Sequence, residues 1–291
     1  MANVTDARYS THNYIGGDQI NNHYMVSHMP PPSSLSFNDA PIDLLSDHFT
    51  GREEELKHIE NALDVTYGDT PTRFVVRGPP GIGKTQLLLQ YVKLSFDKQY
   101  SIIFWISGAT VEKANQGLAK VLTLVGHPDR DHQDQSIRLT LAQRWLEESN
   151  TSGMRRWLLV FDNVAPETVS FLKENLPRRN PSGNILFTTR TGTVADALAS
   201  VAGKKHQVFE LQAPDLRNAT KQLLDEAGID MNGPESGTKD KAEALVKCIG
   251  CLPLAISQAA SFAKTPLMNL DGVLDLYNSS HKYEVGLPTL F

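Results

Sequence analysis

The glycine-rich stretch at residues 78–85, with the sequence GPPGIGKT, constrains the fold more than any other part of the chain. It matches the pattern G-x-x-x-x-G-K-[ST] at every fixed position. The apolar run before it, residues 74–76, predicts a buried strand, and residues 85–94 after it predict a helix. Because a phosphate-binding loop requires this strand–loop–helix context, we favour that interpretation over a glycine-rich turn without a ligand.

The residue types in this stretch suit the phosphates of a nucleotide. Gly81 and Gly83 allow the backbone to turn so that successive N–H groups point at one phosphate, and the following helix adds the positive end of its dipole. Lys84 carries the charge that neutralises the outer phosphates, and the Thr85 hydroxyl is a ligand for Mg²⁺. The predicted nucleotide-binding residues of the loop and the first helical turn are Gly78, Pro79, Gly81, Ile82, Gly83, Lys84, Thr85 and Gln86.

Composition and charge exclude several other classes of protein. The chain has 291 residues, of which 40% are hydrophobic and 21% charged, as is typical of a globular protein with one large or two modest domains. The net charge of −5 does not indicate a nucleic-acid partner, because nucleic-acid binding usually requires a clustered basic surface. The longest apolar runs, residues 102–106 and 157–161, are too short to span a membrane, and the N-terminus does not resemble a secretory signal. We therefore expect a cytoplasmic protein that binds neither nucleic acid nor membrane.

Two cysteines, Cys248 and Cys251, have the spacing of metal-binding and redox-active pairs. However, the sequence offers no second ligand pair nearby, and both cysteines lie in an apolar run that predicts a helix. We therefore expect both side chains to pack in a core.

Residues 1–32 differ in composition from the rest of the chain. They carry few charges, several asparagines and no helical periodicity, so we expect a disordered tail. Asparagine-rich stretches with interspersed aromatic residues are also prone to β-assembly. The run PPPSS at residues 30–34 favours an extended backbone, and we assign residues 33–47 to a Pro/Ser linker.

Five apolar runs alternate with helix-like segments in the middle of the chain. The runs are continuous, which indicates strands buried on both faces, as in a parallel sheet covered by helices. We therefore predict an α/β fold, with a three-layer P-loop NTPase domain over residues 48–212 and a five-stranded, mainly parallel sheet. Residues 213–291 carry only helix-like segments and predict a small all-helical subdomain. The predicted strands are residues 74–76, 101–107, 156–161, 184–187 and 207–211.

The start of the NTPase domain carries a helix-start pattern. Thr50 is followed three residues later by Glu53, and apolar residues at helical spacing come next. This pattern predicts a capping box with Thr50 as the residue that caps the helix.

Asp162 and Asn163 follow directly after the apolar run at residues 157–161. In open α/β sheets, the carboxyl ends of the strands face the crevice in which ligands bind. Four apolar residues followed by Asp form the second nucleotide motif, whose carboxylate holds Mg²⁺. We therefore predict Thr85 and Asp162 as metal ligands, against the alternative that Asp162 only caps a helix.

Arg190 ends the fourth predicted strand, after two threonines. At the carboxyl end of a strand beside the phosphate site, an arginine can contact a γ-phosphate and so report its presence. The alternative is a surface arginine that pairs with a nearby acid.

Together these motifs resemble the NB-ARC family of nucleotide-binding switch proteins, within the STAND class of P-loop NTPases. The resemblance covers about residues 48–280 and includes the family's h-x-G-R-E, magnesium, sensor and G-L-P-L motifs in the family's order. The variants are most similar to fungal, NLR-like members. The matching segments are FTGRE at 49–53, FWI at 104–106, LLVFDNV at 158–164, ILFTTR at 185–190 and GCLPLAI at 250–256.

The resemblance implies that ADP or ATP, with Mg²⁺, binds between the α/β domain and the helical subdomain. By position in the motifs, Gly51 and Arg52 lie near the adenine and ribose, Pro253 packs against the adenine, and Arg190 contacts the γ-phosphate. It also implies a signalling switch, of the kind found in fungal innate immunity or incompatibility. In such a switch ADP holds a closed form and ATP favours an open form that forms homo-oligomers.

Two departures from the family pattern bear on this expectation. The second acid that often follows the magnesium aspartate is Asn163 here, which orients water but cannot accept its proton, so we expect at most a slow ATPase. The residues expected to carry any hydrolysis are Lys84, Asp162, Asn163 and Arg190. The sequence also ends at Phe291, before the family's winged helix and C-terminal repeats, as in a shortened chain or a short natural member.

The tail has a weaker resemblance of its own. Residues 13–22, NYIGGDQINN, resemble a short leader found ahead of NTPase domains in many fungal proteins of this type. The resemblance implies that the tail contacts a partner. Oligomerisation would bring the tails of several copies together, and these tails would stack as cross-β structure.

Three classes of function remain open at this point. We favour the ADP- and ATP-binding switch. A truncated regulatory or decoy fragment would act by binding a partner through its helical subdomain, and a conventional ATPase or kinase would turn over faster. A guanine-specific N-K-x-D signature is not evident, so adenine is the favoured base.

Overall fold

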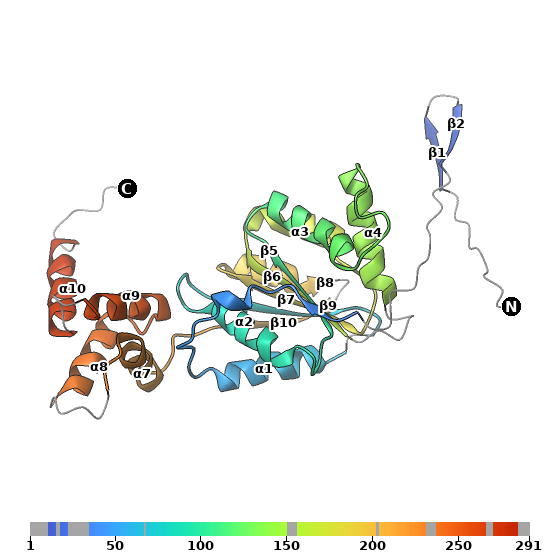
Figure 1. Cartoon of the computed structure of the whole chain (residues 1–291). Coiled ribbons are helices and arrows are strands. Elements are labelled where there is room, and N and C mark those ends of the chain that lie inside the picture. The colour runs from blue at the N-terminus through green and yellow to red at the C-terminus, as the bar shows by residue number, and fades with distance from the viewer. Residues whose placement is uncertain are drawn as a thin grey trace.

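The computed structural model describes residues 11–15, 18–22, 35–66, 68–149, 156–201, 204–230, 237–265 and 270–284. Its centre is a sheet of six parallel strands in the order β10–β4–β7–β6–β5–β3 (Figure 1). The strands of this sheet are β3 (Phe37–Asn38), β4 (Thr72–Arg77), β5 (Ile102–Ser107), β6 (Trp157–Val164), β7 (Gly183–Thr189) and β10 (Gln207–Glu210).

The sheet has one more strand than the sequence predicts. The five predicted strands are present as β4, β5, β6, β7 and β10, and β3 adds an edge strand that pairs with β5. This sixth strand lies in the stretch predicted to be a linker. A strand of two residues is too short to produce a periodic pattern, and its place is explained by a tertiary contact. The Phe37 ring packs edge-on against Phe104, with ring centroids 5.4 Å apart.

The N-terminal tail, predicted to be disordered, contains two short strands. β1 (Thr11–Ile15) and β2 (Asp18–Asn22) pair in antiparallel fashion, with Ile15 opposite Asp18. Two glycines separate the strands in the sequence, and a Gly-Gly pair between short strands is a hairpin signal that composition alone does not contain. The rest of the tail lies outside the described residues.

Helices cover both faces of the sheet, so the domain has the three predicted layers. One core cluster packs the sheet against α1 and α2, and the other packs it against α3, α4, α5 and α6. In β4, Phe74 and Val76 belong to the first cluster and Val75 to the second, and all three are fully buried, which explains the continuous apolar run. These helices are α1 (Glu53–Asp64), α2 (Lys84–Ser95), α3 (Val111–Leu124), α4 (Gln135–Glu148), α5 (Val169–Asn175) and α6 (Gly192–Ala199).

Short elements complete the NTPase domain. They are the 3₁₀ helices η1 (Ile42–Leu44) and η3 (Pro166–Thr168) and the small antiparallel pair β8 (Ser200–Val201) and β9 (Lys204–Lys205).

The start of α1 differs from the predicted capping box. The residue at the N-cap position is Arg52, and no side chain caps the helix. Gly51 and Arg52 both have left-handed backbone angles, with φ of 69° and 72°. This turn directs the chain so that Arg52 lines the cavity described below, which explains why the local capping pattern is not used.

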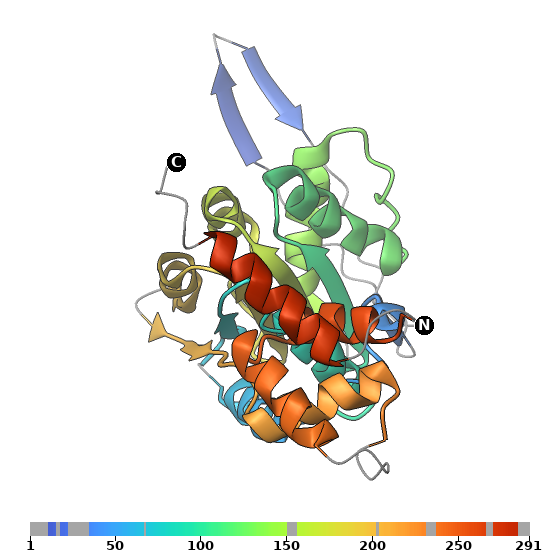
Figure 2. The same ribbon diagram turned by 90° about the vertical axis from the view of Figure 1, so that its left-hand side faces the viewer.

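The described part of residues 216–284 forms the predicted helical subdomain. Its buried side chains make a third core cluster, separate from the two clusters on the sheet. Figure 2 looks onto this subdomain, with α10 in red across its front. No helix in the described ranges has both the length and the apolar character that a membrane span requires. The four helices are α7 (Leu216–Ala227), α8 (Thr238–Cys248), α9 (Pro253–Ala263) and α10 (Leu270–Glu284).

The two cysteines lie at the turn between α8 and α9. Both are free thiols, and Cys251 is half-buried against the helical core. Cys248 is exposed, so the prediction that both side chains pack in a core is wrong for Cys248. The reason is that α8 ends at Cys248, and its last residue faces outward.

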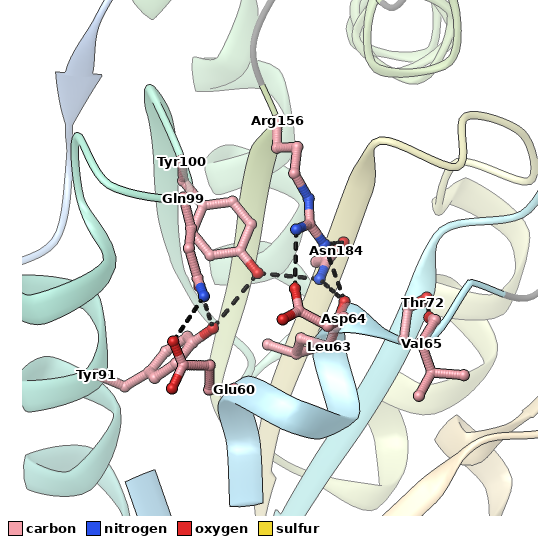
Figure 3. A network of polar contacts seen from close by, with 10 residues as sticks. All are labelled: Glu60, Leu63, Asp64, Val65, Thr72, Tyr91, Gln99, Tyr100, Arg156 and Asn184. Carbon is pink, nitrogen blue, oxygen red and sulfur yellow. Dashed lines mark hydrogen bonds and ion pairs between the residues drawn. The ribbon is translucent and has the colours of Figure 1, made fainter. Parts of the chain in front are cut away.

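A polar network holds the amino-terminal ends of the central strands to α1 and α2 (Figure 3). The Asn184 amide, from β7, donates to the Tyr100 hydroxyl at 2.9 Å and to the Leu63 carbonyl at 2.6 Å. Arg156, just before β6, donates to the same carbonyl at 3.0 Å. The Tyr91 hydroxyl, from α2, lies 3.4 Å from that of Tyr100. These contacts support the sheet at the end opposite to the glycine loop.

Candidate nucleotide-binding site

A cavity of about 580 Å³ lies at the carboxyl end of the sheet. Its walls come from four parts of the chain: the glycine loop with the start of α2, the ends of β6 and β7, the segment at residues 46–52, and helices α7 and α9. Because α7 and α9 belong to the helical subdomain, the cavity is bounded by both parts of the molecule. The family resemblance implies a nucleotide site at this position.

The glycine loop connects β4 to α2 with backbone angles that glycine favours. Gly81 and Gly83 have φ of 75° and 96°, and Gly83 occupies the N-cap position of α2. The first turn of α2 therefore starts at the cavity, where its free N–H groups and the helix dipole favour an anion.

Lys84, the first residue of α2, is buried with 8% of its surface exposed. Its ammonium donates to the carbonyls of Gly78 at 2.8 Å and Pro79 at 2.9 Å. Burial lowers the pKa of Lys84, the nearby charge of Arg190 lowers it further, and Asp162 opposes both effects. A phosphate would give this ammonium an anionic partner in place of neutral carbonyls, so the electrostatics favour an anion here.

Asp162 lies beside Thr85, as the two sequence motifs predict. Its carboxylate accepts hydrogen bonds from the Thr85 hydroxyl at 3.0 Å and from the Thr188 hydroxyl at 2.6 Å. A carboxylate and a hydroxyl side by side are hard oxygen donors, which fit Mg²⁺. No group of three or more His, Cys, Asp or Glu side chains in the described ranges could hold a metal ion. A Mg²⁺ ion here would therefore take its remaining ligands from phosphate oxygens and water.

Asn163 lies in a bulge of β6. The pairing of β6 with β7 shifts between Phe161 and Val164, and Asn163 has a left-handed φ of 58°. Its backbone N–H donates to the Thr188 hydroxyl at 2.6 Å, and that hydroxyl in turn donates to Asp162. The bulge places Asn163 in the cavity wall next to the predicted metal ligand.

Arg190, at the end of β7, is exposed in the cavity wall. Its charge lowers the pKa of Lys84, so the two cations face the same space. That Arg190 contacts a γ-phosphate stays a prediction.

Arg52 has a structural use that the sequence does not predict. Its guanidinium pairs with Glu55 at 2.6 Å and donates to the Ile82 carbonyl at 3.3 Å and the Gln212 carbonyl at 2.9 Å. It therefore links the glycine loop to the chain between the two parts of the molecule. Gly51 lies outside the cavity wall, where the Asn218 side chain leaves only 3.1 Å for an added Cβ.

Gln86 likewise binds protein groups. Its amide donates to the Leu44 carbonyl at 2.9 Å and accepts from the Ser46 backbone N–H at 2.8 Å. These two bonds fix the segment that follows η1 against α2, and the next residues, among them His48 and Phe49, form a wall of the cavity. The sequence does not predict this wall, and its only local signal is its position directly before FTGRE.

The helical subdomain contacts the glycine loop directly. The Leu254 backbone N–H donates to the Gly81 carbonyl at 3.2 Å, and Pro253 lies in the cavity wall at the start of α9. Gln222 of α7 and Ser257 of α9 extend this wall. The sequence predicts Pro253 here, whereas it does not predict Gln222 or Ser257.

A protein-family model described as the NB-ARC domain matches residues 52–216. The chain belongs to the NB-ARC family. The match begins at Arg52 and includes the glycine loop, Asp162 and Arg190. The chain is thus a nucleotide-binding domain of this family.

A relative from Hyaloscypha variabilis is described as a nucleotide-binding leucine-rich repeat (NLR)-like protein. It is 28% identical over 254 residues, which cover 80% of this chain and 24% of the relative. The NB-ARC chain thus spans about a quarter of the length of that relative.

Solved structures share the fold at low sequence identity. A Walker-type ATPase of Pyrococcus abyssi matches with a TM-score of 0.56 and 12% identity, over 81% of this chain and 73% of that one. The Aeropyrum pernix ORC2 protein matches with a TM-score of 0.54 and 13% identity, over 82% and 72%. Cdc6p of Pyrobaculum aerophilum matches with a TM-score of 0.52 and 19% identity, over 86% and 67%. These similarities confirm the predicted P-loop NTPase fold.

Proposed function

We propose that this NB-ARC chain is a signalling switch that binds ADP and ATP with Mg²⁺. The observation that carries the proposal is the cavity wall shared by the glycine loop and the helical subdomain, joined by the hydrogen bond from Leu254 to Gly81. A ligand held there contacts both parts of the molecule, so its binding energy depends on how they are arranged. A ligand that binds two arrangements with different affinity shifts the population between them.

Each part of a nucleotide has a suitable set of side chains. The loop N–H groups and Lys84 would hold the phosphates, Thr85 and Asp162 would hold Mg²⁺, and Arg190 would contact a γ-phosphate. Bound Mg²⁺ would supply positive charge that neutralises the phosphate oxygens. Pro253 is the surface against which the adenine would pack. Because Arg190 reaches only the third phosphate in this assignment, it is the residue that would distinguish ATP from ADP.

Hydrolysis is proposed to be slow. The side chain next to the metal ligand is Asn163, which donates and accepts hydrogen bonds but takes up no proton from an attacking water. A steady-state assay is therefore expected to give a turnover well below about one per second, the lower end of ordinary enzymes. Faster turnover would support a conventional ATPase instead.

The fungal NLR-like relative supports a proposal for the cellular setting. We propose a cytoplasmic role in fungal innate immunity or incompatibility, with homo-oligomers in the ATP state. The tail would then be the output, because the β1–β2 hairpin is a separate two-stranded sheet with unpaired edges among the described residues. A peptide of residues 1–32 is expected to form dye-binding fibrils at high concentration. A peptide that stays monomeric would remove this role of the tail.

The decisive experiment identifies the nucleotide that the purified protein carries. The protein is denatured and the released nucleotide is identified by chromatography, with Lys84→Ala as the matched variant. Retained ADP in the wild-type protein and its loss in the variant would support the switch. An empty wild-type site that also fails to bind added ADP and ATP would support the regulatory or decoy fragment.

A further inference from the structure

Glu226 is the one buried carboxylate among the described residues, with 8% of its surface exposed. It lies on α7, one turn after Gln222, and faces α9. It is not part of the cavity wall itself. A buried carboxylate is costly unless hydrogen bonds compensate it, so its contacts are informative.

Within the described ranges, the two side-chain hydrogen bonds of Glu226 both involve residues of the cavity wall. Its Oε1 accepts from Gln222 Nε2 at 2.8 Å and from the Ser257 hydroxyl at 3.1 Å. Gln222 Nε2 also lies 3.4 Å from the Pro253 carbonyl. Glu226 thus holds two polar side chains from two helices against the residue that begins α9.

These contacts determine which groups of the cavity wall can accept a hydrogen bond from a ligand. A carboxylate and a carbonyl only accept, so the Gln222 amide must direct its NH₂ group toward them, which leaves its Oε1 for a ligand. The single hydroxyl proton of Ser257 is used by Glu226, and its oxygen already accepts from Gln222 Nε2 at 3.5 Å, so a ligand can bind only to the remaining lone pair of that oxygen. Both groups therefore present acceptors to a ligand that donates.

The same contacts exclude phosphate as the ligand group at this wall. Phosphate oxygens accept hydrogen bonds and carry negative charge, and the carboxylate of Glu226 lies directly behind the wall. Like charges repel, and a pair of acceptors forms no hydrogen bond. The uncharged donors of a nucleotide are the sugar hydroxyls and the amino group of the base.

We propose that Glu226 is a positioning residue that sets the selectivity of this site. It holds Gln222 and Ser257 as acceptors for a hydroxyl or amino donor of the bound nucleotide. This inference rests on the proposed nucleotide binding. It assigns to the helical subdomain the recognition of the uncharged part of the ligand, in addition to contact with the glycine loop.

The test compares the wild-type protein with Glu226→Met. The methionine has a similar length but no oxygen acceptor, so the Gln222 amide and the Ser257 hydroxyl lose the group that holds them as acceptors for the ligand. Dissociation constants are measured for ATP, 2′-deoxy-ATP, 3′-deoxy-ATP and inosine triphosphate, which lacks the amino group. In the variant, ATP affinity is expected to fall about three- to tenfold, the range of one hydrogen bond. Affinity for the analogue that lacks the recognised donor is expected to stay within about twofold.

The identity of that analogue distinguishes the two sources of the donor. Loss of discrimination against a deoxy analogue assigns the wall to a sugar hydroxyl, and loss of discrimination against inosine triphosphate assigns it to the base amino group. Equal weakening for all four nucleotides would overturn the proposal, because a merely structural role predicts that result. Unchanged affinity for all four would overturn it as well.

Controls separate this inference from stability and from the proposed function. Asp225→Asn removes the same charge one position away, on the exposed face of α7. It is expected to leave the ratio of ATP affinity to the affinity of each analogue unchanged. If Glu226→Met fails to fold, Ser257→Ala carries the test, because it removes one acceptor and is expected to change the same ratio of ATP affinity to analogue affinity. A wild-type protein that binds no adenine nucleotide would contradict the proposed function. If the wild-type protein binds adenine nucleotides and the Glu226 variant keeps the same ratios of ATP affinity to analogue affinity, only this inference is contradicted.

Discussion

Asn163 is the residue at which the backbone and the proposed chemistry can be tested together. Its left-handed φ of 58° is tolerated by Asn and Asp better than by most other residues, so Asn163→Asp is expected to keep the β6 bulge. The new carboxylate would add a proton acceptor beside Asp162. We expect the ATPase turnover to rise at least about tenfold, because general bases contribute about 10²- to 10⁴-fold.

The control for this prediction is Asn163→Gly, which keeps the backbone conformation and removes the side chain. It is expected to stay at or below the wild-type rate in the same steady-state assay. An aspartate variant that is no faster than this control would show that the missing acid is not what limits hydrolysis.

Asp162 allows the proposed metal site to be tested by binding alone. Asp162→Asn keeps the size of the side chain but loses the anionic oxygen that fits Mg²⁺. ATP affinity without Mg²⁺ is expected to change less than about threefold, whereas its enhancement by Mg²⁺ is expected to disappear. Titrations of ATP with Mg²⁺ and with a chelator measure both values. An unchanged enhancement in the variant would place the metal elsewhere.

The sequence predicts some site residues better than others for a physical reason. Thr85, Asp162 and Arg190 lie at the ends of strands or the start of a helix, and a parallel sheet brings such ends together. The bonds of Arg52 join residues far apart in the chain, for example the Gln212 carbonyl, so no local pattern encodes them. Glu226 and Ser257 were missed for the same reason, since only the packing of α7 on α9 joins them.

At the scale of elements, the network at the start of the strands should give stability a distinct pH dependence. Burial raises the pKa of Tyr100 to about 12, and burial, followed by the neighbouring Tyr100, raises the pKa of Tyr91. An unfolded tyrosine ionises near pH 10, so between about pH 10 and 12 the folded chain holds more protons than the unfolded chain. The contribution of these tyrosines to the free energy of unfolding is therefore fully present below about pH 10. It is lost as pH rises through this window.

Tyr100→Phe tests this pH dependence. At pH 8 it is expected to cost about 1 kcal/mol, through the lost hydrogen bond with Asn184. Above pH 10 its free energy of unfolding should fall less steeply with pH than that of the wild type. The two slopes are expected to differ by up to about 1.4 kcal/mol per pH unit. Urea unfolding at several pH values measures both effects, and Tyr277→Phe, on α10 outside this network, is the control. Parallel curves for Tyr100→Phe and wild type would contradict the role of Tyr100.

The elements also differ in how far the sequence predicts them. Strands such as β5 and β6 are buried on both faces, and burial requires the long apolar runs that make them recognisable. β3 is held by the pairing of its two residues with β5 and by the contact of Phe37 with Phe104, which are tertiary contacts. The bulge at Asn163 is also invisible in the sequence, because a bulge is defined by two strands in register.

At the scale of the whole molecule, the proposed switch depends on the contact between the glycine loop and α9. Gly81 has a φ of +75°, and a Cβ added there would lie 3.1 Å from the Leu254 Cβ. Gly81→Ala therefore acts in two ways: it strains the left-handed backbone by about 1–2 kcal/mol and presses against the helical subdomain. Only the second effect involves the arrangement of the two parts.

A double-mutant cycle separates these effects. Gly81→Ala is expected to weaken nucleotide binding by about tenfold or more. Leu254→Gly, which removes the Cβ that the new methyl group meets, should by itself change it little, because Leu254 is 55% exposed. In the double variant the contact is relieved while the backbone strain remains, so we expect partial recovery, with a coupling energy of about 0.5–3 kcal/mol. Leu276→Ala, also an exposed leucine of this subdomain, should give no recovery. Additive effects of Gly81→Ala and Leu254→Gly would mean that the loop senses the nucleotide without the helical subdomain.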